Sequence, residues 1–382
     1  MNEEKLYYQD CHQKRFTAVV TDCVQTEKGY EITLDQTAFY PEGGGQACDL
    51  GVLADARVLD VREKKEQIIH LCDRPLMVGE TVEGILDWNR RFDLMQQHTG
   101  EHIVSGIIHK KYGWHNVGFH MGSEVVTIDF DGPISQEDLP WIETEANRMV
   151  WGNLPVHCWY PSEAELPSVS YRTKRQLPWP VRIVEIPGVD TCACCGVHVA
   201  ATGEVGFVKL FSCVKFHQGV RIEMACGGRA LAFLSRVYEQ NRQVSQAFSA
   251  KLMETGEAAR KMNEALAAEK YRATAMQKTI FRHTAEQYRN QALAVHFEED
   301  LSPAGVRELA ELIAEACGGT AAVFSGSGDK FDMCLACPGG DVKELGSRMA
   351  KALDGRGGGK PGFFQGSVRA TKGRIQEFFR NI

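Results

Sequence analysis

Short runs of alternating apolar and polar residues dominate the first quarter of the chain. The segments RFTAVVTDC, GYEITLD and ADARVLDVRE alternate in this way between residues 14 and 85, and glycine-containing turns separate them. A period of two residues with such breaks is typical of antiparallel strands. Residues 1–85 are therefore predicted to form a small β-barrel that carries a glycine-rich loop.

The period changes to that of a helix after residue 86. Apolar residues recur at three- and four-residue steps from Asp87 to about Tyr112, where Gly113 offers a stop. A second helix is expected in SQEDLPWIETEANRMVWGN, after a Ser cap, and strands are expected in GSEVVTIDF, VRIVEI, GEVGFVKLF and GVRIEMAC. Residues 86–227 are predicted to form one mixed α+β domain.

A long helical region is predicted over residues 228–290. It contains no proline, is rich in Ala, Glu, Lys, Arg and Gln, and repeats apolar positions at helical spacing. Gly256 interrupts the pattern, which leaves open a helical hairpin that turns near this residue or a single kinked helix. Residues 291–382 alternate strand and helix patterns and predict a compact α/β domain. The whole chain is thus expected to be an α+β multidomain protein.

Composition favours a globular protein without a membrane span. Apolar residues make up 43% of the sequence and charged residues 24%, and no apolar run approaches the ~18 residues of a membrane helix. The first ten residues lack the features of a secretory signal, so we expect a cytoplasmic protein whose cysteines are reduced. Its 13 cysteines are then expected to be metal ligands, catalytic groups or buried thiols.

The charge of the chain is unevenly distributed. A net charge of −7 argues against indiscriminate binding of polyanions. Residues 341–382 nevertheless carry nine Lys or Arg and only four Asp or Glu. We therefore expect the C-terminal domain to offer a local basic surface to RNA.

Two pairs of residues with metal-binding side chains are each spaced four residues apart. The first pair lies one turn apart on the helix predicted after residue 86, so both imidazoles leave the same face. The second pair lies in TCACCGVHV. One thiolate and three imidazoles suit a tetrahedral Zn²⁺ site. The predicted metal ligands are His98, His102, Cys194 and His198.

The spacing leaves open which sulfur binds and what the metal does. Cys192 and Cys195 form a CxxC pair around Cys194, and their alternative role is that of buried thiols. Four ligands bound at once would make the site structural, whereas an open position would make it catalytic. HTGEH also spells the H-x-x-E-H signature of a class of zinc peptidases, in which Glu101 would be the general base. The Cys/His pair argues against that class.

Three segments together resemble the editing domain of alanyl-tRNA synthetase. They are DQTAFYPEGGGQ, RRFDLMQQHTGEH, and CCGVHV followed by TGEVG, in that order. Considered alone, the triple glycine is a hairpin turn. GRGGGKPGFFQGS similarly resembles the DHH-associated domain that ends this synthetase. Because the first ten residues lead directly into the predicted barrel, no aminoacylation core is expected, and the chain resembles the long form of the AlaX trans-editing family.

The resemblance implies zinc-dependent hydrolysis of tRNA(Ala) mischarged with serine or glycine. It implies a substrate site in the glycine-rich loop, where Thr37 would bind the seryl hydroxyl. The implied substrate-binding residues are Thr37, Gly43, Gly44, Gly45 and Gln46. The candidate catalytic residues are His98, Glu101, His102 and His120, the last of which aligns with a polar editing position. A non-catalytic RNA-binding protein with a closed structural zinc is the alternative.

The C-terminal domain is expected to bind tRNA or to form a homodimer together with the helical region. Glycines would let the backbone approach phosphate, and basic side chains would pair with it. The predicted tRNA-binding residues are Gly357, Gly358, Gly359, Lys360, Arg369, Lys372 and Arg374. A DHH-type phosphoesterase is excluded because no aspartate-rich DHH motif precedes this domain, and a threonyl-type editing module would lack this domain.

Overall fold

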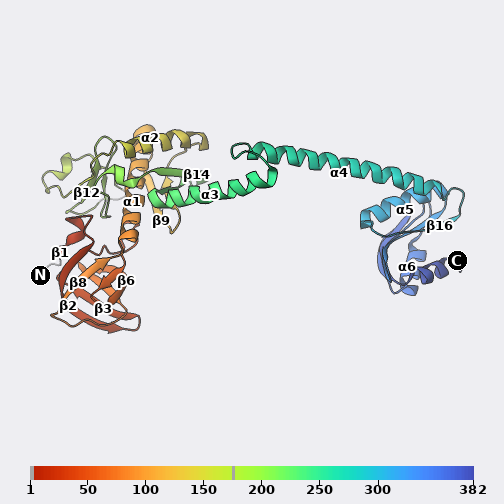
Figure 1. Cartoon of the computed structure of the whole chain (residues 1–382), viewed down its shortest axis with the longest axis horizontal. Coiled ribbons are helices and arrows are strands. Elements are labelled where there is room, and N and C mark those ends of the chain that lie inside the picture. The colour runs from red at the N-terminus through yellow and green to blue at the C-terminus, as the bar shows by residue number, and fades with distance from the viewer. Residues whose placement is uncertain (1–3, 174–176) are drawn as a thin grey trace. The chain divides into compact units, whose positions relative to one another are not determined.

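The computed structural model describes residues 4–173 and 177–382. The chain divides into a first unit, Met1–Gln243, and a second unit, Val244–Ile382. Each unit combines helices with sheets (Figure 1), so the expected α+β class is confirmed. Among the described residues, no helix is both long enough and apolar enough to cross a membrane.

A closed barrel forms the N-terminal part of the first unit, with the strand order β2-β3-β7-β6-β5-β8. Its strands are β2 (Arg15–Thr26), β3 (Gly29–Leu34), β5 (Gly51–Leu53), β6 (Ala56–Lys64), β7 (Gln67–Cys72) and β8 (Thr81–Leu86). In β2, Phe16, Ala18 and Val20 are buried while the residues between them are more exposed, as a period of two requires. Strands β1 (Glu4–Lys5) and β4 (Gln36–Thr37) form a separate parallel pair, and the 3-10 helix η1 is Leu6–Tyr8.

Helix α1 (Trp88–Tyr112) follows the barrel and has the predicted ends. The side chain of Asp87 caps its first turn by accepting the Arg90 amide, and Gly113 ends it with a left-handed φ of 78°. A fully buried ion pair ties this helix to the chain before it. Nε of Arg91 donates to both carboxylate oxygens of Asp49 at 2.9 Å. The ion pair between Arg91 and Asp49 therefore fixes α1 against the segment that precedes β5.

Two sheets and helix α2 (Leu139–Trp151) pack with α1 in the first unit. One sheet is antiparallel with the order β14-β15-β10-β9, and the other has the order β11-β12-β13. Their strands are β9 (Asn116–Met121), β10 (Val126–Phe130), β11 (His157–Trp159), β12 (Ile183–Ile186), β13 (Asp190–Ala193), β14 (Val208–Phe216) and β15 (Gly219–Cys226). The 3-10 helices are η2 (Gln136–Asp138), η3 (Leu166–Ser168) and η4 (Thr202–Val205). Buried Ile103 of α1, Ile142 of α2 and Ile222 of β15 share one hydrophobic core.

The strand expected in GEVGFVKLF is only partly correct. Its first residues belong to η4, and the strand β14 begins at Val208. The carboxylate of Glu204 accepts the backbone amides of Ala200 and Ala201, and Gly206 has a φ of 81°. These local bonds close a turn in place of an extended strand.

The helical region contains two helices, α3 (Gly227–Phe248) and α4 (Thr255–Glu286). The break covers residues 249–254, where Ser249 has a φ of 51°. Gly256 therefore lies inside the first turn of α4 and does not mark the turn itself. The chain divides into its two units at Gln243 and Val244, within α3. Phe281 and Ala285 of α4 pack in a core of the second unit.

The second unit is built on a five-stranded sheet of order β16-β17-β18-β20-β19. Its strands are β16 (Leu293–Glu298), β17 (Thr320–Ser327), β18 (Lys330–Ala336), β19 (Arg356–Lys360) and β20 (Phe363–Arg369), and its helices are α5 (Pro303–Cys317), α6 (Lys343–Ala352) and α7 (Lys372–Arg380). One core contains residues of α5 and the end of α4, and another contains residues of α6 and α7. The glycine-rich stretch forms the hairpin of β19 and β20.

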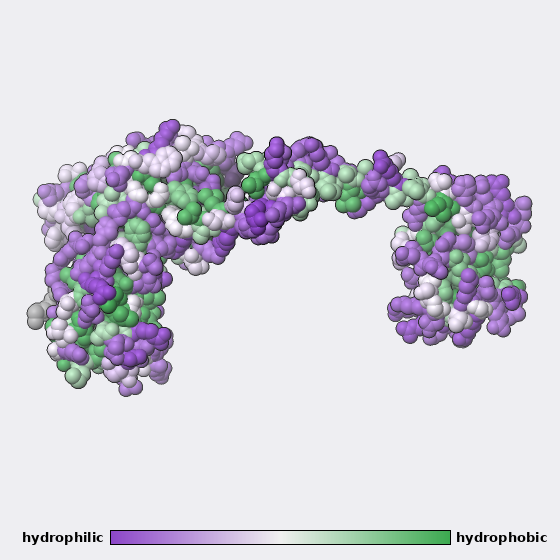
Figure 2. Space-filling view, in the orientation of Figure 1, coloured by the Kyte–Doolittle hydropathy of each residue, from purple (hydrophilic) through white to green (hydrophobic). Residues whose placement is uncertain are grey.

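Hydrophilic side chains cover much of the surface of both units in Figure 2. Helix α4 also exposes apolar side chains at Met262, Leu266, Met276 and Ile280. Its buried residues, Phe281 and Ala285, lie near its C-terminal end. Most of α4 therefore depends on its own helical propensity and on surface ion pairs rather than on a covering layer.

Candidate metal centre and cavity

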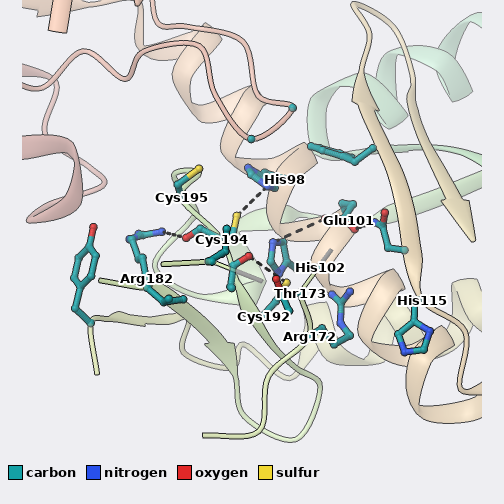
Figure 3. A pocket seen from close by; sticks show the side chains of 18 of the residues that line it. His98, Glu101, His102, His115, Arg172, Thr173, Arg182, Cys192, Cys194 and Cys195 are labelled. Carbon is teal, nitrogen blue, oxygen red and sulfur yellow. Dashed lines mark hydrogen bonds and ion pairs between the residues drawn. The ribbon is translucent and has the colours of Figure 1, made fainter. Parts of the chain in front are cut away.

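The four predicted metal ligands come together in the first unit. The ligand atoms of His98, His102, Cys194 and His198 all lie within 4.8 Å of one another. Successive turns of α1 supply the first two residues, and the segment after β13 supplies the other two. Figure 3 shows Cys194 facing the two α1 histidines. The sulfur of Cys194 lies 3.4 Å from Nε2 of His98.

The geometry selects one of the three neighbouring cysteines. Cys194 belongs to the cluster with three histidines, whereas Cys192 lies close to His102 and Asp190. In Figure 3 the sulfur of Cys195 is turned away from Cys194. The ambiguity that the sequence leaves among these thiols is therefore resolved in favour of Cys194.

Each of the three histidines is held through Nδ1 by a second side chain. The pairs are His98 with Oε1 of Gln46 at 2.7 Å, His102 with Oδ2 of Asp190 at 2.9 Å, and His198 with Oγ1 of Thr99 at 3.2 Å. Metal-bound histidines are commonly oriented by such outer partners. Nε2 of His198 is buried and has no hydrogen-bond partner in the described part of the chain. The donor set and this unpartnered nitrogen fit a zinc ion.

Protonation of the ligands is also shifted by their surroundings. Burial by itself raises the pKa of the Cys194 thiol, but the charge of His98 and the neighbouring His102 and His198 rings hold that pKa well below its usual value. Burial, together with the charge of His98, lowers the pKa of His198 to about 3. A thiolate and a neutral imidazole are the forms that bind a metal.

Asp190 connects His102 to an arginine in the cavity wall. Its carboxylate accepts His102 Nδ1 and both Nε and Nη2 of Arg172, the latter two at 2.6 and 2.7 Å. Burial acts to raise the pKa of Asp190, but the hydrogen bonds from His102 and Arg172 outweigh it and lower that pKa to about 2. The carboxylate is therefore charged and fixes the orientation of the His102 ring.

A cavity of about 610 Å³ opens beside the ligands. Side chains of His98, His102 and Cys194 form part of its wall. Further lining residues are Gly44, Gly45, Glu101, Asn116, Phe119 and Tyr160. The metal ligands are thus accessible from a space that combines polar, aromatic and backbone surfaces, which is typical of a ligand site.

The glycine-rich loop reaches the site as a tight turn. Gly43 and Gln46 exchange backbone hydrogen bonds of 3.1 and 2.9 Å, and Gly44 and Gly45 have φ of 60° and 84°. A Cβ on Gly45 would lie 2.5 Å from the Phe119 ring, so the close approach needs glycine. The loop therefore has the form of the hairpin turn that the triple glycine predicts. Gln46, predicted to bind substrate, accepts a hydrogen bond from His98 instead of facing solvent.

Thr37 and His120 lie away from the cavity. The hydroxyl of Thr37 is fully buried and pairs with Nε2 of His70 at 2.9 Å, so its role in serine recognition stays a prediction. His120 is exposed on β9 and is not among the residues that line the cavity. Its neighbour Phe119 stacks on His98 with 5.2 Å between ring centroids. Neighbouring residues of a strand face opposite sides, so Phe119 is the β9 aromatic residue that lies at the site, and a catalytic role of His120 stays a prediction.

Glu101 faces the cavity from α1 (Figure 3). Ser105 Oγ and Asn116 Nδ2 both donate to its Oε1 at 2.5 Å, and its Oε2 lies 3.9 Å from Nε2 of His102. Among the residues at the site, Glu101 is indicated by its motif, whereas Asn116, Phe119, Arg172 and Asp190 are not predicted from the sequence. No motif indicates these residues, because they reach the site from three segments far apart in the sequence: β9, the segment at Arg172, and β13.

The residues predicted to bind tRNA lie at one end of the second unit's chain. A Cβ on Gly357 would lie 2.6 Å from the Gln365 carbonyl oxygen, so this glycine has a packing role. Arg374 donates to the Ala352 carbonyl at 2.8 Å. The others are placed as follows: Gly358, Gly359 and Lys360 on the exposed edge strand β19, Arg369 at the end of β20, and Lys372 with its Nζ 4.8 Å from the Phe297 ring. Their contact with tRNA stays a prediction.

Comparison with protein families defines the class of the two parts of the first unit. Residues 2–90 match the family described as tRNA synthetases class II (A). Residues 181–223 match the Threonyl and Alanyl tRNA synthetase second additional domain. The barrel and the segment with Cys194 and His198 are thus of a kind found in tRNA synthetases.

Relatives that match over most of the chain narrow this class. Alanyl-tRNA editing protein Aarsd1-A of Xenopus laevis is 30% identical over 376 residues, which cover 96% of this chain and 91% of the relative. Aarsd1 of Mus musculus is 29% identical over 399 residues, covering 96% and 94%. AlaX-L of Pyrococcus horikoshii is 33% identical over 246 residues, covering 61% and 60%. The chain belongs to the alanyl-tRNA editing protein family.

Proposed function

We propose that this protein is a zinc-dependent trans-editing deacylase that hydrolyses the ester between a wrong amino acid and tRNA(Ala). The observation that carries the proposal is the convergence of one thiol and three imidazoles beside a cavity, whose wall includes Cys194, His98 and His102, in a chain of this family. His198 Nε2, buried without a partner, supports a metal at this place. The names of the relatives indicate which RNA is the substrate, since each is called an alanyl-tRNA editing protein.

The chain's own residues hold and shape this site. A Zn²⁺ ion held by the three histidines and Cys194 would supply a Lewis acid for the ester or an activated water. Gln46, Asp190 and Thr99 keep the imidazoles oriented through Nδ1. The Gly44–Gly45 backbone and the Phe119 ring bound the cavity, where they would limit the size of the aminoacyl group.

Serine is the proposed wrong amino acid, with glycine second. An alanine pocket distinguishes its substrate from one that differs by a methyl or hydroxyl group by only about 1 to 3 kcal/mol, so a second site is needed. Thr37 keeps its proposed role as the residue that binds the seryl hydroxyl. Because its own hydroxyl pairs with His70, this role requires a rearrangement on substrate binding. Thr37→Val should lower the ratio of seryl to alanyl hydrolysis, and an unchanged ratio would remove the role.

Deacylation of Ser-, Gly- and Ala-tRNA(Ala), with and without a chelator, tests the proposal. We expect hydrolysis of the seryl ester, slower hydrolysis of the alanyl ester, and loss of both on metal removal with recovery on adding Zn²⁺. His102→Ala or Cys194→Ala should abolish activity. Full activity in metal-depleted protein would contradict the zinc mechanism. A protein that loses structure without metal yet never hydrolyses any ester would be the non-catalytic RNA-binding alternative.

A further inference from the structure

Among the described residues, the hydrogen-bond donors to the Glu101 carboxylate in the cavity wall are neutral groups. Glu101 is 5% exposed, and Ser105 Oγ and Asn116 Nδ2 both donate to its Oε1. Its other oxygen, Oε2, lies 3.9 Å from Nε2 of His102. Because that ring nitrogen belongs to the metal cluster, it is not a dedicated partner for the carboxylate.

Two arginines among the described residues of the cavity wall, Arg172 and Arg182, are already bound elsewhere. Arg172 makes its bidentate pair with Asp190. Arg182 donates to the carbonyl oxygens of Cys194 and Gly196 at 3.1 and 2.8 Å. Neither of these arginines therefore pairs with Glu101, and a positively charged group of a ligand in the cavity is a suitable partner for this carboxylate beside the metal ligands.

Asn116 adds a second acceptor beside this carboxylate. Asn116 is 5% exposed, and its Oδ1 atom is buried without a hydrogen-bond partner in the described part of the chain. Its Nδ2 is used by Glu101, so the amide is oriented and the unpartnered atom is the acceptor. Both residues line the cavity. The pair therefore matches a ligand that brings several N–H donors and a positive charge.

We propose that Glu101 and Asn116 bind the α-ammonium group of the aminoacyl ester. This inference rests on the proposed function and adds a recognition element to it. The α-ammonium is attached to the carbon next to the ester carbonyl, so holding it beside His102 places that carbonyl near the metal ligands. The site selects esters with a free α-amino group, and it disfavours esters in which the ammonium is absent or acylated.

The test compares two esters of the same tRNA. One is Ser-tRNA(Ala), and the other is its product of nitrous acid deamination, in which a hydroxyl replaces the ammonium. The variant Glu101→Gln keeps the volume and an acceptor for Ser105 and Asn116 but removes the charge. Glu83→Gln, an exposed residue of β8 outside the cavity, is the matched control. kcat/KM is measured for both esters with each protein, and zinc content is measured alongside.

We expect Glu101→Gln to lower kcat/KM for the seryl ester by about 10- to 100-fold, the range for losing a charged hydrogen bond. The deaminated ester should change by less than about threefold, since no ammonium is lost. Asn116→Ala should shift the ratio in the same direction by a smaller factor. Glu83→Gln should leave both rates unchanged.

Three results would overturn the inference. An equal loss for both esters in Glu101→Gln would assign Glu101 to proton transfer or to folding. A loss of bound zinc with an unchanged ester ratio would assign it to the metal centre. If Glu101→Gln and Asn116→Ala both hydrolyse the two esters at the wild-type rates, recognition of the ammonium lies elsewhere. Failure of the wild type to hydrolyse either ester would instead overturn the proposed function, and this inference with it.

Discussion

At the residue scale, the site depends on side chains that hold the ligands as much as on the ligands. Gln46 comes from the glycine-rich turn, Asp190 from β13 and Thr99 from α1, and each fixes one imidazole. Outer partners of this kind set the ring orientation and basicity of the ligand. Their removal should therefore weaken metal binding without removing a ligand.

Gln46→Ala is expected to weaken zinc binding by about 10- to 100-fold, because His98 loses the partner of its Nδ1. Competition with a chromogenic chelator measures the affinity. Gln25→Ala, an exposed glutamine of β2, is the control. An affinity in Gln46→Ala equal to that of the control would show that the turn does not orient His98.

His70 makes the stability of the barrel depend on pH. Burial lowers the pKa of His70 from 6.5 to about 4. Between pH 6.5 and pH 4 the unfolded chain therefore binds a proton at His70 that the folded chain does not. The stabilisation of the folded state by the neutral His70 ring is complete above pH 6.5 and is lost as the pH falls towards 4. The free energy of unfolding falls by at most about 1.4 kcal/mol per pH unit.

Urea unfolding at pH 7 and pH 5 tests this for wild type and His70→Gln. All six tryptophans lie in the first unit, so their fluorescence reports its unfolding. The wild type should lose more stability than the variant between the two values. Equal losses would mean that other groups, and not His70, govern the acid sensitivity.

At the element scale, α1 links the barrel to the metal centre. Its N-terminal cap, its left-handed glycine stop and its two ligands are all local features of one segment. Its attachment depends on Arg91, which is fully buried and bound to Asp49. Asp49 also accepts the backbone amide of Tyr40, so the same carboxylate holds the start of the glycine-rich loop.

Arg91→Met should destabilise the first unit by about 3 to 5 kcal/mol, because Asp49 would stay buried without its cation. Asp87→Ala removes only the helix cap and should cost about 1 kcal/mol. Chemical unfolding followed by tryptophan fluorescence measures both. Equal effects of the two substitutions would contradict the importance of the buried pair.

At the scale of the whole molecule, the two units divide the proposed work. The first unit contains the metal cluster and the cavity, and the second contains the basic C-terminal segment. Helix α4 packs within the second unit, so a chain ended at residue 290 would leave the end of α4 without its cover. The break at 249–254 is the better place to separate the units. The predicted homodimer stays a prediction, for which the exposed apolar residues of α4 offer a site to mutate.

A chain that ends at residue 248 should keep zinc and still hydrolyse a seryl minihelix. It should bind full-length tRNA(Ala) more weakly, with a smaller salt dependence, because phosphate contacts are lost. Lys360→Glu with Arg369→Glu in the full chain should act in the same direction. Filter binding at two salt concentrations measures both effects. Unchanged tRNA affinity in the shortened chain would mean that the basic segment is only a solvated face.

The sequence by itself determined those features that depend on residues close together in the chain. The two periods, the ends of α1 and the two pairs of ligands could all be predicted, because strand and helix geometry set them within a few residues. The tertiary structure decided which of three cysteines faces the histidines, why Phe119 and not His120 meets the site, and how Gln46, Asp190 and Asn116 support it. These residues lie on separate strands and turns, and only the packing of α1 among them brings their side chains within bonding distance.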